Sequence, residues 1–376
     1  MPRLADADRE RITDLFDRHL DVGLHHGAQL AVYVDGECVL DLAGGETGPD
    51  GDRTTPETRY VLFSCTKPYA AVALHSLVDE GDLEYDDRVV DYWPKFADSG
   101  TEKSEITIRQ VLSHTAGLQY GEINDRPDRW TDWEASVETV EGMDLVTSPG
   151  EEPAYHALTF GWLVGELVRR VAGTPIEVAA RERVFDPLGM DDTGIGLRED
   201  EPDDVATLVG FEAFDRCRDP GEGLNADYTD LAALFNEEHI HRAVIPAANG
   251  LGTARDMARF YACLANGGEL DGTRVLSEGA VDEMTALQAE TDADGTLSRP
   301  ARFALGFWKG GTGADPYGSL TPERVFGHAG LGSSVGWADP EENVGFAYVT
   351  NGVRDGTYEH VARSRSIADA VRLALR

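Results

Sequence analysis

Strand-like hydrophobic patterns occur at both ends of the 376-residue chain, whereas helical patterns fill the middle. Near the amino terminus, the apolar segments 28–34 and 37–42 flank Asp35-Gly36, a dipeptide that favours the tight type I′ turn of a β-hairpin. Near the carboxyl terminus, the segments 303–308, 335–338 and 344–350 form a second strand-rich region, with a turn at 339–343. We therefore expect one antiparallel sheet to which both ends of the chain contribute strands.

Amphipathic helices are predicted at both ends and through the middle. Ile12 and Phe16 belong to a helical apolar stripe before the first strand, and Ile367 and Val371 belong to a closing helix. Further helices are expected near residues 65–80, 106–115, 158–172, 175–185 and 254–266. The predicted fold class is α+β, with an antiparallel sheet built from both termini, flanked by helices, and a mostly helical middle region. Residues 1–376 are expected to form a single unit, with 1–70 and 300–376 in the sheet part and 71–299 in the helical part.

The charge balance limits the partners of this chain. It has 69 Asp and Glu against 33 Lys and Arg, a net charge of −36, but its 41% hydrophobic residues are enough for a large core. Such a polyanion repels nucleic acids and anionic membranes, which leaves small molecules as the expected partners. Because lysine is scarce among the basic residues, we expect adaptation to concentrated salt, in which the Debye length falls to about 3 Å. An ordinary acidic protein is the alternative.

The sequence also suggests where the protein works. The amino-terminal segment has no apolar stretch of the signal-peptide kind, and no window approaches the roughly 18 to 20 apolar residues of a membrane span. Cys38, Cys65, Cys217 and Cys263 form no Cys-x-x-Cys pair, which indicates free thiols in a reducing compartment rather than a zinc site. We expect a soluble cytoplasmic protein, and its oligomeric state remains open.

One short motif carries recognisable chemistry. Ser64 and Lys67 form the only Ser-x-x-Lys sequence in the chain, where the apolar run 60–63 gives way to a predicted helix. A three-residue step places the two side chains about 60° apart on one helix face, so they can share a proton. A chain that otherwise uses arginine keeps a lysine here, and arginine cannot give up its proton to act as a base. The alternative is a surface lysine that follows an ordinary helix-capping serine.

A serine nucleophile also needs a proton relay and an oxyanion hole, and two downstream segments could supply them. Tyr155 precedes a predicted helix and could share a proton with Lys67. His328 follows the predicted strand 324–327, and Gly330 would allow a substrate to approach the strand backbone closely. Taken alone, Tyr155 is more often a packed aromatic residue and His328 a structural histidine.

Six ordered motifs resemble those of the serine β-lactamase-related hydrolases, which have the penicillin-recognising fold, and especially the class C β-lactamase-like esterases. The Ser-x-x-Lys signature is common to this group. The motifs cover most of the chain: Phe63-Ser64-Cys65-Thr66-Lys67, Val111-Leu112-Ser113-His114-Thr115-Ala116-Gly117-Leu118, Tyr155-His156-Ala157-Leu158-Thr159-Phe160-Gly161, Asp186-Pro187-Leu188-Gly189-Met190, Pro246-Ala247-Ala248-Asn249-Gly250 and Gly327-His328-Ala329-Gly330.

The resemblance implies a role for each residue of the site. Ser64 would be the acylated nucleophile, Lys67 its proton partner and Tyr155 the general base that activates serine and later water. The backbone N–H groups of Ser64 and Leu331 would form the oxyanion hole. No cofactor and no metal are implied.

Two departures from the β-lactamase pattern bear on the substrate. The third motif, Lys-Thr-Gly in true β-lactamases, is His328-Ala329-Gly330 here, and the Tyr-x-Asn motif ends in Ala157. The groups that hold a carboxylate and polarise an amide in those enzymes are therefore missing, which favours a carboxylesterase acting on small neutral esters. A β-lactamase or D-alanyl or D-amino peptidase, a metal-dependent hydrolase, and a non-catalytic binding module with the same fold remain alternatives. Gln119 could supply a substitute polar contact, but a solvated loop residue is the simpler expectation.

A second serine motif is expected to be structural. Gly332-Ser333-Ser334-Val335-Gly336 matches the G-x-S-x-G motif of α/β-hydrolases, which requires a helix immediately after the serine. A hairpin pattern follows Ser334 instead, so we assign it no catalytic role.

Overall fold

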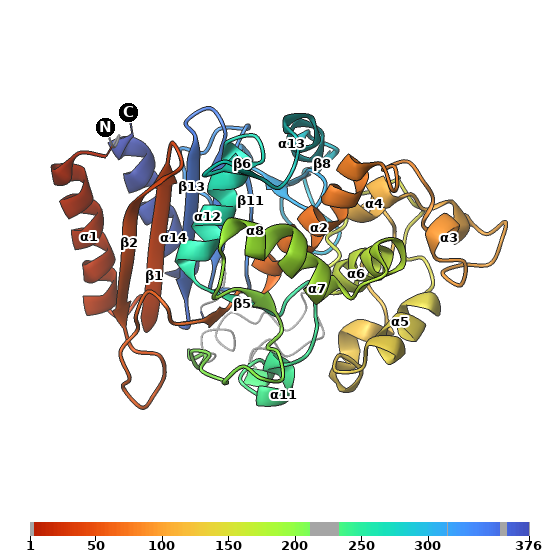
Figure 1. Ribbon diagram of the computed structural model, residues 1–376, viewed down its shortest axis with the longest axis horizontal. Helices are drawn as coiled ribbons and strands as arrows, with labels where there is room; N and C mark the ends of the chain where they lie inside the picture. The colour runs from red at the N-terminus through yellow and green to blue at the C-terminus, as the bar shows by residue number, and fades with distance from the viewer. Residues whose placement is uncertain (1–3, 211–232, 314, 354–358, 376) are drawn as a thin grey trace.

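An antiparallel sheet of eight strands is the largest element of the structure (Figure 1), a computed structural model that describes residues 4–210, 233–313, 315–353 and 359–375. The strand order is β2-β1-β13-β12-β11-β10-β9-β8. Two strands come from the amino-terminal end and six from the carboxyl-terminal end: β1 Gly27–Val34, β2 Glu37–Gly45, β8 Ala289–Thr291, β9 Ala301–Phe303, β10 Trp308–Lys309, β11 Phe326–Ala329, β12 Val335–Asp339 and β13 Val344–Thr350. Strand β1 pairs directly with β13, which confirms the prediction that both ends of the chain build one sheet.

The β1–β2 hairpin forms for the predicted reason. Asp35 and Gly36 have φ angles of 52° and 80°, so both adopt the left-handed conformation that a type I′ turn requires. The predicted strand 303–308 is wrong, because residues 304–307 turn between β9 and β10 and Gly306 has a φ of 83°. An added Cβ on Gly306 would lie 2.4 Å from that of Ala71, so the turn packs closely on helix α2 (Lys67–Glu80).

Helices cover both faces of the sheet. The terminal helices α1 (Asp6–Asp21) and α14 (Glu359–Ala374) lie together on one face, at the left of Figure 1. Ile12 and Phe16 of α1 pack with Leu30 and Val32 of β1 in one apolar cluster, whereas Ala31 belongs to the larger cluster on the opposite face. This alternation is that of a strand buried on both sides. It confirms that the terminal helices flank the sheet.

Helix α12 (Ala254–Ala265) covers the second face and comes close to the strands. A Cβ added to Gly345 would lie 2.4 Å from backbone atoms of Ala258 and Ala262, and one added to Gly336 would meet Tyr261. Only glycine allows this distance between helix and strand.

The middle of the chain is mostly helical, as predicted. Helices α2, α4, α6, α7 and α12 occupy the expected positions, whereas α3, α5, α11 and α13 were not predicted. The remaining elements are α3 Val89–Tyr92, α4 Ile108–Leu112, α5 Trp133–Glu141, α6 Thr159–Ala172, α7 Ile176–Ala180, α8 Asp186–Leu188, α11 Glu238–His241 and α13 Glu278–Thr285, with the short strands β3 Tyr60–Val61, β4 Gly194–Ile195, β5 Gly250–Gly252, β6 Glu269–Leu270 and β7 Thr273–Arg274.

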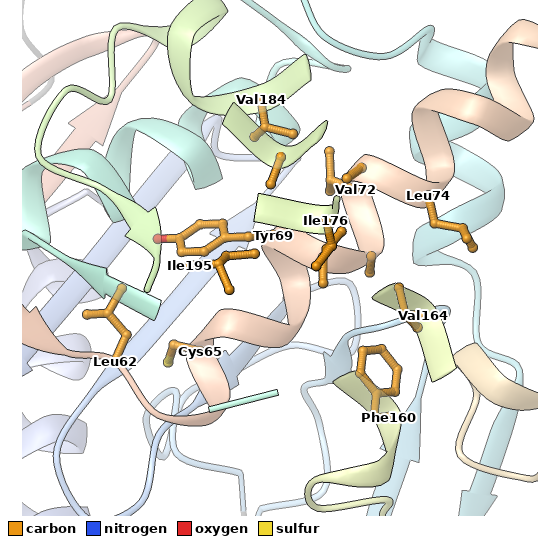
Figure 2. Close-up of a cluster of buried hydrophobic side chains, with 14 of the residues drawn as sticks. Leu62, Cys65, Tyr69, Val72, Leu74, Phe160, Val164, Ile176, Val184 and Ile195 are labelled. Carbon is orange, nitrogen blue, oxygen red and sulfur yellow. The ribbon is translucent and has the colours of Figure 1, made fainter. Parts of the chain in front are cut away.

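Helix α2 runs through the centre of the largest apolar cluster. Figure 2 shows Tyr69, Val72 and Leu74 of this helix among apolar side chains of α6 and of the segment 176–195. Every residue from Lys67 to Leu77 is buried. The amino group of Lys67, at the start of this helix, is therefore removed from water.

Three of the cysteines are free thiols, as predicted: Cys38, Cys65 and Cys263. Cys217 lies outside the described residues. In the described part of the chain, no helix has both the length and the apolar character needed to cross a membrane.

Candidate active site

Ser64 lies at the predicted junction between strand and helix. Strand β3 ends at Val61, Ser64–Thr66 form a single 3₁₀ turn, and α2 begins at Lys67. Phe63, immediately before the serine, has a φ of 46° and a ψ of −131°, a backbone conformation that residues other than glycine rarely adopt. This strained residue turns the chain sharply and leaves Ser64 partly exposed while its neighbours are buried.

Lys67 is fully buried, and its Nζ lies within hydrogen-bond distance of three oxygen atoms. Its Nζ lies 3.0 Å from Ser64 Oγ, 2.7 Å from the carbonyl oxygen of Ala157 and 3.0 Å from that of Ala247. Burial lowers the pKa of Lys67 well below that of an ordinary lysine. The two carbonyls can only accept hydrogen bonds, so they hold both N–H groups of a neutral amine. Its lone pair is then left to face Ser64 and can accept the proton of the serine hydroxyl.

Tyr155 lies against the same lysine. Its ring centroid is 4.8 Å from Lys67 Nζ, and its side chain is buried. Burial raises the pKa of Tyr155 strongly, and the neighbouring Ser64 hydroxyl opposes that rise only in part. The phenol is therefore held in its protonated form, in which it can donate a proton. Among the described residues, no atom lies at both the distance and the angle needed for a hydrogen bond with its buried hydroxyl.

Two backbone N–H groups beside Ser64 are available to an oxyanion. In the described part of the chain, neither the amide of Ser64 nor that of Leu331 donates to an acceptor. The turn that presents Leu331 is closed by a 2.8 Å hydrogen bond from Gly330 N–H to Ser334 O. A Cβ on Gly330 would lie 2.4 Å from the carbonyl oxygen of Leu62, so this turn can reach the Ser64 segment only with glycine.

His328 lies on strand β11 itself, so the predicted end of that strand at residue 327 is wrong. Its ring is buried beside Trp308, with ring centroids 4.6 Å apart, and 5.9 Å from the ring centroid of Tyr155. Burial lowers the pKa of His328 well below its ordinary value, so the ring is neutral. Its Nδ1 lies 2.9 Å from the carbonyl oxygen of Ala329, which assigns the ring proton to Nδ1 and leaves Nε2 as an acceptor. A neutral acceptor replaces the cationic lysine of the β-lactamase motif.

The structure therefore brings Ser64, Lys67 and Tyr155 together. His328 lies beside Tyr155, and the turn at Gly330 packs on the segment that leads to Ser64. The chain also resembles known proteins over most of its length, because the family model described as Beta-lactamase matches residues 12–370. The chain belongs to the beta-lactamase family. It is an enzyme of the serine hydrolase type.

Individual members of the beta-lactamase family agree with this assignment. Esterase/beta-lactamase LipL of Mycobacterium tuberculosis is 37% identical over 344 residues, which cover 86% of this chain and 77% of LipL. The crystal structure of a penicillin-binding protein homologue from Caulobacter crescentus superposes with a TM-score of 0.84 at 33% identity, and covers 99% of this chain and 98% of its own. A family VIII carboxylesterase structure has a TM-score of 0.84 at 29% identity, with the same coverage. These likenesses confirm the predicted fold class and the family resemblance.

The structure corrects the expectation for Gln119 and shows the contacts of the neighbouring His156. Gln119 is 4% exposed, so its prediction as a solvated loop residue is wrong, and its Oε1 is buried without a partner among the described residues. His156 has a structural role in this beta-lactamase-family site: its Nε2 accepts a hydrogen bond from Leu118 N–H, and its Nδ1 lies 2.7 Å from Ala154 O. Burial lowers the pKa of His156 to about 4, which keeps the ring neutral.

Ser334 precedes a strand and not a helix, as predicted. Strand β12 follows directly, and Ser334 Oγ is buried and donates a 2.7 Å hydrogen bond to the carbonyl oxygen of Leu62. His241 is paired with the carboxylate of Asp203 and with the carbonyl oxygen of Phe235. Across the described ranges, no group of three or more His, Cys, Asp or Glu side chains is arranged to hold a metal ion.

Proposed function

We propose that this protein is a carboxylesterase that cleaves small neutral esters through an acyl-Ser64 intermediate, and that residues 1–376 act as one catalytic unit. The observation that carries the proposal is the 3.0 Å hydrogen bond between Ser64 Oγ and a fully buried lysine, whose two N–H groups as a neutral amine are held by backbone carbonyls. This arrangement keeps a basic lone pair aimed at the serine.

In the proposed acylation, Ser64 Oγ attacks the ester carbonyl carbon while its proton passes to Lys67 Nζ. The amides of Ser64 and Leu331 receive the negative charge that develops on the carbonyl oxygen. The Tyr155 hydroxyl donates its proton to the departing alkoxide and recovers one from Lys67. An alcohol leaves, and the acyl group remains on Ser64.

Deacylation reverses these transfers with water in place of the alcohol. A water molecule attacks the acyl carbon, its proton passes through Tyr155 to Lys67, and Ser64 recovers its proton as the carboxylic acid leaves. The directions of the two pKa shifts support Lys67 as the final proton acceptor and Tyr155 as the relay. In this scheme Lys67 accepts the proton of Ser64, and Tyr155, for which the family resemblance implies the role of general base, passes protons between Lys67 and the alcohol or water.

The substrate preference is proposed from the groups that line the site. The neutral acceptor at His328 offers no positive charge to the carboxylate of a β-lactam or peptide, and Ala157 offers no amide. Relatives named as esterases support an ester substrate, and a D-amino acid amidase of the same fold keeps small amides as the second candidate. The test compares hydrolysis of p-nitrophenyl butyrate and nitrocefin in multimolar salt, with and without EDTA. Comparable nitrocefin turnover, or loss of activity in EDTA, would contradict the proposal.

The rate should depend on pH through Lys67. Because burial lowers the pKa of Lys67, the amine is neutral at pH values where an ordinary lysine is charged. As the pH falls through that lowered pKa, Lys67 takes up a proton and loses its lone pair, so kcat/KM should fall on the acid side. A pH profile of kcat/KM for p-nitrophenyl butyrate checks this sign. A rate that rises steadily as the pH falls would rule out Lys67 as the proton acceptor.

Stability should depend on salt. The excess of 69 acidic over 33 basic residues produces self-repulsion that concentrated salt screens, and we propose that the protein works in a salt-rich cytoplasm. Dilution into low salt should therefore unfold the protein, with loss of its circular dichroism signal and its esterase activity. Full activity and an unchanged spectrum without added salt would contradict salt adaptation.

A further inference from the structure

The backbone that carries Tyr155 is held from both sides. Ala154 N–H donates to the carbonyl oxygen of His114 at 2.9 Å, and His156 N–H donates to His114 Nδ1 at 3.1 Å. The N–H of Tyr155 points the other way, as expected for successive residues of an extended segment, and donates to the carboxylate of Asp294. The Tyr155 N lies 2.9 Å from Oδ2 and 3.2 Å from Oδ1 of that carboxylate.

Asp294 belongs to the turn between β8 and β9, far from Tyr155 in the sequence. It is only 2% exposed, and its Oδ1 also accepts hydrogen bonds from the backbone N–H groups of Thr296 (2.8 Å) and Leu297 (2.7 Å). Burial raises the pKa of Asp294, and these backbone donors and Arg299 oppose the rise. The Asp294 carboxylate thus links the segment 153–157 to this turn by hydrogen bonds from the Tyr155 N–H.

The same turn also contacts the Tyr155 ring indirectly. The guanidinium of Arg299 lies 4.9 Å from the centroid of the Trp308 ring, and Trp308 stands edge-on to Tyr155 with ring centroids 5.4 Å apart. A Cβ added to Gly295 would lie 3.1 Å from that of Ala154, so the turn packs directly on this segment. The turn therefore contacts both the backbone and the ring side of the proposed proton relay.

We propose that Asp294 is a positioning residue for the proton transfer: its carboxylate holds the Tyr155 backbone so that the phenol stays against Lys67 and Ser64. This inference rests on the proposed function, because it assigns Asp294 a task in that reaction. Asp294 contacts no reacting atom, so it acts only through Tyr155. A displacement of about 1 Å in a catalytic group can cost about 10²-fold in rate.

Asp294→Asn tests the contact to Tyr155 while preserving the turn. The asparagine carbonyl can take the place of Oδ1 and keep the bonds from Thr296 and Leu297. Its NH₂ group then replaces Oδ2, the nearer of the two acceptors of Tyr155 N–H, so two donors oppose each other there and only the longer contact with Oδ1 is left. We expect kcat for p-nitrophenyl butyrate, expressed per fluorophosphonate-labelled Ser64, to fall about 10²-fold, with KM nearly unchanged. The matched control is Asp292→Asn, the same chemical change at an exposed position of the same turn, which should leave kcat unchanged.

A double-mutant cycle separates positioning from a general structural effect. In a Tyr155→Phe background the relay is already lost, so Asp294→Asn should reduce kcat little further. An equal loss of kcat in both backgrounds would overturn the proposal, as would a loss no larger than that of Asp292→Asn. An Asp294→Asn chain that unfolds in concentrated salt would also overturn it, because the retained turn bonds predict a folded variant. Failure of the proposed function is a distinct result, since the parent protein would then show no labelling of Ser64.

Discussion

Replacing Ser64 with alanine should lower ester turnover about 10³-fold or more, because no other group can form the acyl intermediate. The Ser64 side chain is partly exposed, and its hydroxyl is hydrogen-bonded to Lys67 Nζ. The substitution should therefore leave folding intact. Turnover of p-nitrophenyl butyrate and thermal unfolding, both in concentrated salt, check the two parts of this expectation.

Ser334→Ala is the matched control, since it removes a hydroxyl from the other serine motif of the chain. It deletes the hydrogen bond to the carbonyl oxygen of Leu62, which also accepts one from Cys65 N–H. We expect a loss of about 1 kcal/mol in stability and little change in kcat. If Ser334→Ala abolished turnover and Ser64→Ala did not, the assignment of the nucleophile would be wrong.

Lys67→Arg should also reduce turnover about 10³-fold or more. The proposed mechanism needs a neutral nitrogen with a lone pair facing Ser64, and a guanidinium keeps its proton and offers no acceptor. The pocket bounded by the carbonyl oxygens of Ala157 and Ala247 is also shaped for a single nitrogen. The measurement is kcat, together with the rate of fluorophosphonate labelling of Ser64.

Lys103→Arg provides the control for this change of side chain. Lys103 Nζ donates to three backbone carbonyls, those of Val140, Glu141 and Met143, and is remote in sequence from the site. Arginine can satisfy such carbonyls, so activity should be retained. Equal losses in Lys67→Arg and Lys103→Arg would show that Lys67 is needed only for packing.

The sequence predicted the sheet and the core of the site because both depend on local patterns. Asp35-Gly36 specifies its turn through backbone preference alone, and the Ser64 to Lys67 spacing specifies one helix face. The order of the strands and the packing of α12 on Gly336 and Gly345 depend on contacts between distant segments. Periodicity within one segment does not contain that information.

The scarcity of lysine proved a weaker signal than the sequence suggested. Lys103 and Lys309 are also partly buried, and both donate to backbone carbonyls. Burial lowers the pKa of each to about 8. Burial and carbonyl contacts are therefore shared by three of the four lysines, and the hydrogen bond with Ser64 distinguishes Lys67 from Lys103 and Lys309.

Sequence reasoning missed Asp294 and misjudged Gln119. Asp294 is one of 69 acidic residues, and nothing in its neighbourhood along the chain marks it as buried. Its contact with Tyr155 arises only when β8 and β9 join the sheet. A single buried carboxylate in an acidic chain can be recognised only from the fold.

The most direct test of the mechanism is to locate the covalent adduct. The protein is treated in concentrated salt with a fluorophosphonate, digested and analysed by fragment-ion mass spectrometry, in parallel with Ser64→Ala. We expect one adduct, on Ser64, whose formation parallels the loss of esterase activity and which is absent from Ser64→Ala. An adduct on Ser334 or any other residue, or complete inhibition without an adduct on Ser64, would contradict the proposed mechanism.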